Sequence, residues 1–444
     1  MRTRSTVRVY TCVALLIACA LGVVAAQQPQ LRTDNATIPS GQSAGHATAS
    51  RPGHASTALN SQEIAGIAIA AVIVFVAAGG GTGGGAVMSA IYTLIAGLDL
   101  KVAIPLSSIT IVGGAIANFL LNVRKARRNS NAPLIDWDLV LAMQPMLLLG
   151  ANFGTFINAI FPAWLLSVLL VIILVFVGKR TLQKAIEQRR RERWGCWGDD
   201  DAAVSLIGAQ TYHQQQQQQQ QSSSANAIIP WKKVGALFGL FAGVVVLSLI
   251  AGTSKFPSIV GISPNSFLGF IASFLPVIFL VVYSQQSMKN IQETFYRQQN
   301  PRYVLSPDEI QWSPRNVQYF PLVAMGAGTL AGMFGIGGGM INAPMLLELG
   351  VDPLAASAIT ATTVLFSSSM SSFSYILLGA LNFRLAVIML PMGFISTFLG
   401  NVVLERVIKR FNCPSLIIWS MAIIIVISAG AMTVESFRTL SRGE

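Results

Sequence analysis

Apolar runs of about twenty residues recur along most of this chain, and they constrain its fold more than any other feature. Each is long enough for a helix to cross a lipid bilayer, where only helices and closed barrels satisfy the backbone polar groups. The chain is 53% hydrophobic and 11% charged, whereas an average soluble protein is about 25% charged. The sequence therefore predicts an all-α fold, a polytopic transmembrane helical bundle.

Two of the apolar segments are too long for one simple crossing. We expect segments at residues 64–97, 101–123, 138–159, 162–178, 234–253, 266–283, 319–349, 353–378, 385–405 and 414–432. Glycines, which break helices, interrupt the first and the seventh of these. The first holds Gly79 to Gly85 with Thr82 between them, and the seventh holds Gly332 and then Gly335 to Gly339 around Ile336. Each is predicted to form a glycine-broken helical hairpin.

The two glycine clusters mark an internal repeat. Gly81 to Gly85 aligns with Gly335 to Gly339, and further on Pro145 aligns with Pro391 and Gly154 with Gly400. Two crossings in each hairpin and an odd number between the copies place the copies upside down relative to each other. Inverted repeats with broken helices at equivalent positions are typical of secondary carriers, whose substrate site lies near the membrane midplane.

The positive charges favour this topology. If the hairpins enter and leave on the same side and the N-terminal tail is lumenal, 20 of the 30 Lys and Arg residues fall in cytoplasmic loops and 7 on the other side. Lys and Arg favour the cytoplasmic side of short loops. Their clustering in loops also argues against a nucleic-acid partner, despite the net charge of +12.

The N-terminus has the pattern of a secretory signal peptide. A basic stretch precedes apolar residues from Val13 to Val24 and the small residues Ala25 and Ala26. An uncleaved anchor is the alternative. Asn35 begins a glycosylation triplet in the tail that follows, which agrees with insertion through the secretory pathway. The sequence does not identify the membrane.

The expected organisation follows from these segments. It comprises a signal peptide (1–26), a disordered lumenal or extracellular tail (27–61), a first transmembrane repeat (62–178), a disordered cytoplasmic loop (179–232), linking transmembrane helices with a cytoplasmic loop (233–318), a second transmembrane repeat (319–432) and a C-terminal tail (433–444). The loop at 179–232 carries a basic run and a glutamine tract, with too few apolar residues to pack. It is either a spacer or a binding segment for cytosolic partners or lipid headgroups.

The glycine breaks are the candidate substrate site. Unwound backbone cannot face lipid, so it must line a cavity or pack on protein. Exposed N–H groups and helix N-termini brought together there suit an anion, although glycines also serve close helix packing. Hydroxyls and amides nearby could add hydrogen bonds. The candidate substrate-binding residues are Gly81, Gly83, Gly84, Gly85, Ser107, Ser108, Thr110, Gln144, Gly335, Gly337, Gly338, Gly339, Asn342, Thr360, Thr362 and Thr363.

Several other chemistries find no support in the sequence. The three histidines lie outside the apolar segments, which excludes a buried histidine relay. Neither glycine cluster has the Gly-Lys-Ser/Thr of a phosphate-binding loop. No metal site, nucleophile with its base, or carboxylate pair is apparent, so we expect no enzyme activity, metal or cofactor.

The second glycine cluster and the region of Asp136 carry a family resemblance. The run from Gly335 to Leu347, with Ala358 to Thr363 behind it, and the stretch from Asp136 to Met146 resemble the TauE/SafE membrane proteins, especially their plant and protist branch. The resemblance covers roughly residues 64–185 and 319–432. It implies export of sulfite, sulfoacetate or related sulfur oxyanions.

Together these observations predict a secondary transporter that exports a small, sulfur-containing oxyanion. A membrane scaffold that recruits cytosolic partners through residues 179–232 is the alternative. The sequence leaves open the coupling ion and whether the chain forms a homo-oligomer.

Overall fold

The structure is a computed structural model that describes residues 61–78, 85–126, 133–196, 229–253, 256, 258–261, 266–298, 314–349, 351, 353–411, 429–430 and 433. Its contacts divide the chain into residues 1–64 and residues 65–444. The expected signal peptide, the glycosylation triplet at Asn35, the glutamine tract and most of the apolar segment at 414–432 lie outside the described residues.

Helices account for almost all of the described chain. They are α2 (Ser61–Ala77), α3 (Gly85–Leu94), α4 (Leu100–Asn122), α5 (Trp137–Ile160), α6 (Ala163–Cys196), α8 (Trp231–Ala251), α9 (Phe267–Gln298), α10 (Pro314–Phe334), α11 (Gly339–Glu348), α12 (Pro353–Leu377) and α13 (Phe383–Phe411). Five of them, α4, α5, α8, the first part of α9 and α13, have the length and composition to cross a membrane. The described residues contain no strand, and the predicted all-α polytopic fold is confirmed.

Both overlong segments consist of two helices. The first contains α2 and α3, and the second contains α10 and α11. Between α10 and α11 the backbone turns at Gly335, Gly337 and Gly338, which have φ angles of 65°, 77° and 68°. Residues with a side chain rarely adopt such angles, so glycines at these positions end α10 where they do. We call Gly335 to Gly338 the second glycine break.

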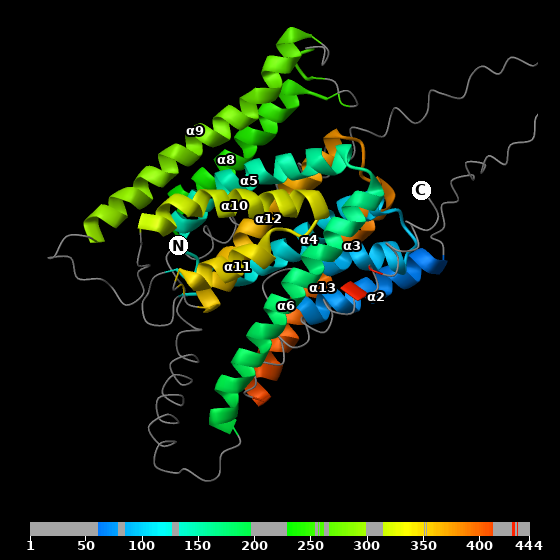
Figure 1. Cartoon of the computed structure of the whole chain (residues 1–444), viewed down its shortest axis with the longest axis vertical. Helices are drawn as coiled ribbons and strands as arrows, with labels where there is room; N and C mark the ends of the chain where they lie inside the picture. Colours follow the sequence, from blue (N-terminus) through cyan, green and yellow to red (C-terminus); the bar gives the residue numbers. More distant parts are fainter. Residues whose placement is uncertain are drawn as a thin grey trace, which may run out of the picture. The chain divides into compact units, whose positions relative to one another are not determined.

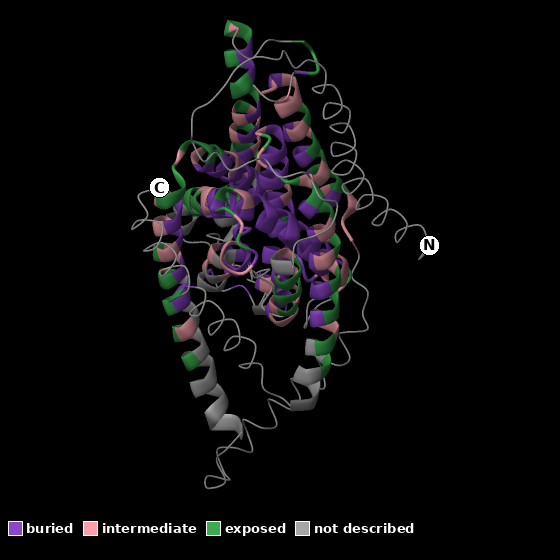
Figure 2. Ribbon diagram, turned by 90° about the vertical axis from the view of Figure 1, so that its right-hand side faces the viewer, coloured by how far each residue is buried: buried purple, intermediate pink, exposed green. Residues whose placement is uncertain are grey.

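Two helices, α4 and α12, form the middle of the bundle. They pack on each other, α4 also packs on α13 and α3, and α12 also packs on α5 and α11. Outside them, α10 lies along α5, while α8 and α9 pair with each other and contact α5 (Figure 1). Buried residues gather on the middle helices, and exposed residues follow the outer ones (Figure 2).

Glycines let several of these helices approach closely. A Cβ atom at Gly328 of α10 would overlap the Leu147 carbonyl of α5, and one at Gly113 of α4 would overlap the Leu390 carbonyl of α13. Small residues at such contacts are the usual means of packing helices in membranes, where lipid is as apolar as the side chains.

The aligned glycines of the two halves make corresponding contacts. Gly154 of α5 lies against the Thr329 carbonyl of α10, and Gly400 of α13 lies against the Phe75 carbonyl of α2. Thr329 and Phe75 occupy equivalent positions when Gly335 is aligned with Gly81. The pairing of α4 with α13 likewise corresponds to that of α12 with α5. These contacts agree with a two-fold relation between the halves, whose opposite orientation in the membrane stays a prediction.

One expected boundary differs from the structure. Helix α6 continues to Cys196, so the loop expected to begin at residue 179 does not begin before 197. The physical reason is that the apolar run extends only as far as the part of the helix that lies in lipid. The helix itself continues for as long as its residues favour helical structure in water. Residues 179–196 are rich in Lys, Arg, Gln and Glu, which are good helix formers in water.

Candidate functional site

Hydroxyl groups from both middle helices hold the second glycine break. Ser107 of α4 donates to the Gly335 carbonyl at 2.9 Å, and Ser367 of α12 donates to the Gly337 carbonyl at 3.3 Å. A Cβ atom at Gly335 would lie 2.5 Å from the Ile104 carbonyl oxygen. The break is therefore pressed against α4, and its shape depends on glycine.

The first glycine segment reaches the same place. A Cβ atom at Gly85, the first residue of α3, would lie 2.6 Å from the carbonyl oxygen of Ile336 in the second break. Ile111 of α4 contacts both Gly85 and Gly337. The structure thus brings together Gly85, Ser107 and the second break, as predicted, whereas Gly81, Gly83 and Gly84 lie outside the described residues.

The N-terminus of α11 opens from this break. The amides of Ile341 and Asn342 both bond to the Gly338 carbonyl at 3.2 Å, which starts the helix. The N–H groups that precede these two, those of Gly339 and Met340, have no carbonyl of their own helix to bond, and the helix dipole adds about half a positive charge at that end. Gly337, Gly338 and Gly339 are all buried. The arrangement suits an anion by its geometry.

Most of the predicted hydroxyl donors are already satisfied. Ser108, Thr110, Thr362 and Thr363 each donate to a carbonyl of their own helix. Thr110 also bonds to the Tyr92 hydroxyl at 2.8 Å. Such bonds back to the helix are common for Ser and Thr. These side chains shape the site, and binding an anion through their hydroxyls would require those bonds to be exchanged.

A second group of buried polar atoms has no hydrogen-bond partner. Within the described part of the chain these atoms are both amide atoms of Gln144, Oδ1 of Asn342, Nε1 of Trp137 and the hydroxyls of Thr360, Ser368 and Ser372. A buried polar group left unpaired costs about 1–3 kcal/mol. The Ser368 hydroxyl would lie 3.0 Å from a Cβ atom at Gly337. Unpaired groups thus adjoin the second glycine break.

The amides of the apolar segments separate into two groups. Asn118 accepts from Asn401 at 2.6 Å, and Asn152 accepts from Ser374 at 2.8 Å, so these two join helices. Gln144 and Asn342 instead retain unpaired atoms. The sequence offered no means of separating the groups, because each amide is equally costly in an apolar segment without a partner.

Two polar residues beside the break were not among the candidates predicted from the sequence. Asn158 of α5 donates to the Met333 carbonyl at 2.8 Å, and Tyr375 of α12 donates to the Gly332 carbonyl at 2.5 Å. Both bonds secure the end of α10. The signal was the presence of polar side chains in apolar segments, which identifies candidates but not their partners.

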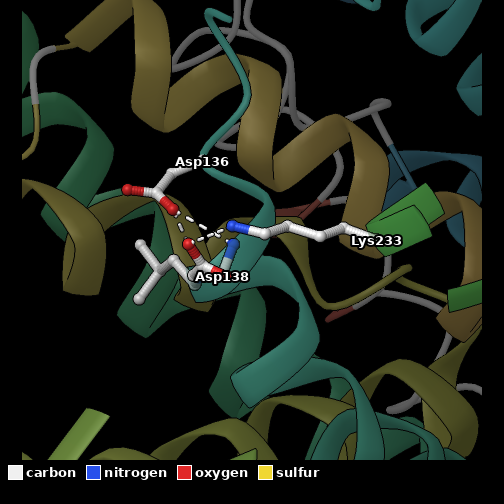
Figure 3. A network of polar contacts seen from close by, with 4 residues as sticks. Asp136, Asp138 and Lys233 are labelled. Carbon is white, nitrogen blue, oxygen red and sulfur yellow. Dashed lines mark hydrogen bonds and ion pairs between the residues drawn. The ribbon is translucent and has the colours of Figure 1, made fainter. Parts of the chain in front are cut away.

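The site is electrically neutral in its side chains. The buried residues of the described chain include no Asp, Glu, Lys, Arg or His. Asp138 lies at the start of α5, where its exposed carboxylate pairs with Lys233 of α8 at 2.5 Å beside the helix cap Asp136 (Figure 3). The described residues also hold no group of side chains that could bind a metal ion.

A hollow opens beside the break. Its volume is about 460 Å³, and it is lined by Val323, Gly326, Ala327, Thr329, Leu330 and Ile341. Ala327 also neighbours Gly338, because a Cβ atom there would lie 3.4 Å from the Ala327 carbonyl. The lining is mostly apolar, so the hollow is a space next to the polar site and not the site itself.

The fold and site define a class: a polytopic α-helical membrane protein whose broken helices meet in the core, as in secondary carriers. The family model for sulfite exporter TauE/SafE matches residues 66–254 and 202–432. The chain belongs to this family.

Plant relatives agree with this assignment. Sulfite exporter TauE/SafE family protein 1 of Arabidopsis thaliana is 30% identical over 376 residues, covering 82% of this chain and 82% of that protein. Family protein 5 of the same plant is 29% identical over 354 residues, covering 79% and 77%. No solved structure matches the chain.

Proposed function

We propose that the protein is a secondary carrier that exports a small, sulfur-containing oxyanion, bound where the two glycine segments meet. The observation that carries the proposal is the contact of Gly85 with Ile336, which joins both broken segments in the buried core. Membership of the sulfite exporter TauE/SafE family supports transport of this kind of anion. Export is the direction given in the family's name.

The second break supplies the proposed contacts. The N–H groups of Gly339 and Met340 at the start of α11 would donate to the anion, as would the unpaired Ser368 hydroxyl beside Gly337. Hydrogen bonds to a charged group contribute about 1.5–3 kcal/mol each. Two of them would account for roughly two to four decades of affinity.

The unpaired polar atoms favour this proposal over helix packing alone. A packing motif needs small residues and close backbones, and it gains nothing from buried hydroxyls and amides without partners. Each unpaired group lowers stability unless a ligand or water completes its bonds. The unpaired groups that adjoin the glycine break, such as the Ser368 hydroxyl, are therefore easier to explain by a bound ligand.

Gly338→Val tests the site directly. The neighbours of Gly338 leave room for a Cβ atom at ordinary contact distances, but its φ of +68° strains any L side chain. We expect a folded, membrane-inserted protein whose transport in proteoliposomes is lost. Gly239→Val in α8, where a Cβ atom meets nothing within 4 Å, is the matched control and should transport normally. Near wild-type affinity in purified Gly338→Val would show that the glycines are packing devices.

Removing residues 197–228 separates the carrier from the scaffold alternative. In a screen of sulfite, thiosulfate and organosulfonates, a carrier should keep whatever flux the intact protein shows, because the described site lies elsewhere in the chain. A scaffold should lose its cellular role. If the intact protein moved none of the anions in such a screen, the carrier proposal would be abandoned.

The proposed topology rests on the charge distribution and on one contact. The pair between Asp138 and Lys233 places the starts of α5 and α8 at the same end of the bundle. Cysteines introduced near Lys125 and at Lys184 should both react only from the cytosolic side, with Asn35 glycosylated. Reaction from opposite sides would contradict the inverted repeat.

A further inference from the structure

Hydrogen bonds fix the orientation of the Asn342 amide at the second glycine break. The Thr363 hydroxyl gives its proton to the Thr360 carbonyl at 2.9 Å. It can therefore only accept from Asn342, whose Nδ2 lies 3.5 Å away. The amide oxygen, Oδ1, then faces away from Thr363 and is a buried acceptor without a donor.

A fully ionised oxyanion cannot satisfy this atom. Its oxygens are all acceptors, and so is Oδ1. The Ser368 hydroxyl, which adjoins Gly337, could donate to the anion, but Asn342 requires a ligand that donates. The break thus offers both donors and an acceptor to whatever binds there.

A second unpaired amide lies on a helix that packs beside the break. Gln144 lies on α5, about one turn before Leu147. The Leu147 carbonyl contacts Gly328 of α10, and Ala327, the residue before Gly328, packs on Gly338. Both polar atoms of the Gln144 side chain are buried and unpaired. An amide needs both a donor and an acceptor as partners, whichever way it is turned.

The described residues of the helices around the site provide no buried positive charge. Among the buried residues described in α11, α12 and the helices packed on them, which are α4, α5, α8 and α10, the titratable group is the hydroxyl of Tyr375, which is hydrogen-bonded. The Tyr92 hydroxyl of α3, which packs on α4, is hydrogen-bonded to Thr110. Lys101 of α4 and Asp138 of α5 are exposed, and Glu348 ends α11 six residues beyond Asn342. The cost of burying an ion rises with the square of its charge, so this site disfavours a dianion.

We propose that the site takes its oxyanion as a protonated monoanion, of which hydrogen sulfite is the simplest example. This inference rests on the proposed transport function. The O–H group of the ligand donates to Oδ1 of Asn342, while its other oxygens accept from the N–H groups at the start of α11 and from the Ser368 hydroxyl. The site should bind dianions such as sulfate poorly because of their charge. It should also bind alkylsulfonates poorly, because they are monoanions without an O–H group to donate to Asn342.

The test compares three anions in proteoliposomes of the full chain, at equal pH on both sides. Sulfite uptake above that of protein-free liposomes should rise as pH falls, following the monoanion, whose ratio to the dianion changes about tenfold per pH unit. Methanesulfonate should be slower than hydrogen sulfite by at least about tenfold, because a site built for an O–H discriminates strongly against its absence. Sulfate should be slower still.

Three variants assign the preference to the amides. Asn342→Leu should reduce the ratio of sulfite to methanesulfonate uptake by about tenfold or more. Asn401→Leu removes the same group from an amide pair that is satisfied within the protein, so it should lower stability without changing that ratio. If Asn342→Leu fails to fold, Gln144→Met, which removes the other unpaired amide, provides a second measurement of the ratio.

The outcomes separate this inference from the proposed function. Rapid transport of sulfate or methanesulfonate with no pH dependence would overturn the protonated monoanion while leaving the carrier intact. No flux of any anion would overturn the carrier, and the inference with it. An unchanged ratio in both Asn342→Leu and Gln144→Met would overturn the assignment to these amides.

Discussion

Helix α12 and the paired helices α8 and α9 differ in how their composition relates to their burial. From Ala355 to Leu377 almost every residue of α12 is buried, although the helix carries many Ser and Thr residues and is not among the helices apolar enough to be identified as spans. Helices α8 and α9 have the highest mean hydropathies of the identified spans, 2.5 and 2.3, yet only 33% and 28% of those spans are buried. The two most apolar spans are thus among the most exposed, although hydropathy alone does not decide burial, because α4 and α13 share a mean hydropathy of 1.8 and are 89% and 33% buried.

The reason is that lipid replaces water as the solvent. Burying a leucine against protein gains little when the alternative neighbour is a lipid tail, so helix contacts depend on close fit and hydrogen bonds. In α12, hydroxyls bond to their own backbone, as Thr362 does to Ala358 and Ser371 to Ser367. This helix can therefore be polar and still lie in the core.

The largest expected effect contrasts two glycines. In Gly332→Val the new Cβ atom would overlap the Ala151 carbonyl oxygen and would lie 3.0 Å from the Thr155 backbone nitrogen. We expect a loss of about 3 kcal/mol or more in the free energy of unfolding, because the backbones of α5 and α10 must separate. Gly239→Ala in α8 has open space and should change it by between zero and about +1 kcal/mol. Unfolding in detergent by increasing denaturant measures both, and equal losses would contradict the comparison.

A smaller contrast concerns two phenylalanines. Phe366 of α12 is fully buried, with ring centroids 5.2 and 5.8 Å from Phe238 and Phe241 of α8. Phe366→Ala should lower the free energy of unfolding by on the order of 2–3 kcal/mol. This is at or below the usual loss for a buried Phe in a soluble protein, because moving the ring from lipid into the protein core is nearly neutral. Phe267 of α9 is 79% exposed, so Phe267→Ala should cost less than about 0.5 kcal/mol. Thermal unfolding of the two variants in matched lipid nanodiscs would decide, and a larger loss for Phe267→Ala would sink the idea.

The sequence predicted the helical class and the second glycine break because both depend on local chemistry. Apolar length indicates a membrane helix, and consecutive glycines indicate where it breaks. The end of α6 could not be predicted in this way, since residues 179–196 remain helical beyond the apolar run. Local patterns thus located the elements more reliably than their boundaries.

The candidate site was predictable only in part. The glycines and Ser107 are close together as expected, but Ser108 and Thr362 are occupied by bonds to their own helices. Which amides join helices and which retain unpaired atoms depends on the helix opposite, as Asn118 and Asn342 illustrate. That information belongs to packing and is absent from spacing along the chain.

A third contrast concerns polar contacts between helices. Ser374→Ala removes a donor to Asn152 that joins α12 to α5. Hydrogen bonds of this kind in membrane proteins contribute about 0.6 kcal/mol on average. We expect a loss of that order, whereas Ser273→Ala in α9 removes only a bond to the Gly269 carbonyl of its own helix and should be nearly neutral. Denaturant midpoints measured side by side would test the difference, and a loss of several kcal/mol for either variant would contradict it.

The smallest expected effect belongs to the ion pair at the end of the bundle. Lys233 of α8 and Asp138 of α5 lie 2.5 Å apart, but their side chains are 43% and 66% exposed (Figure 3). Water and salt screen such a pair, and exposed pairs contribute about 0.2–1 kcal/mol. A double-mutant cycle with Lys233→Met and Asp138→Asn should give a coupling energy in this range that shrinks as salt is added. A salt-independent coupling of several kcal/mol would mean that the pair is shielded, and that α8 is anchored to α5 more firmly than its exposed, lipid-facing surface implies.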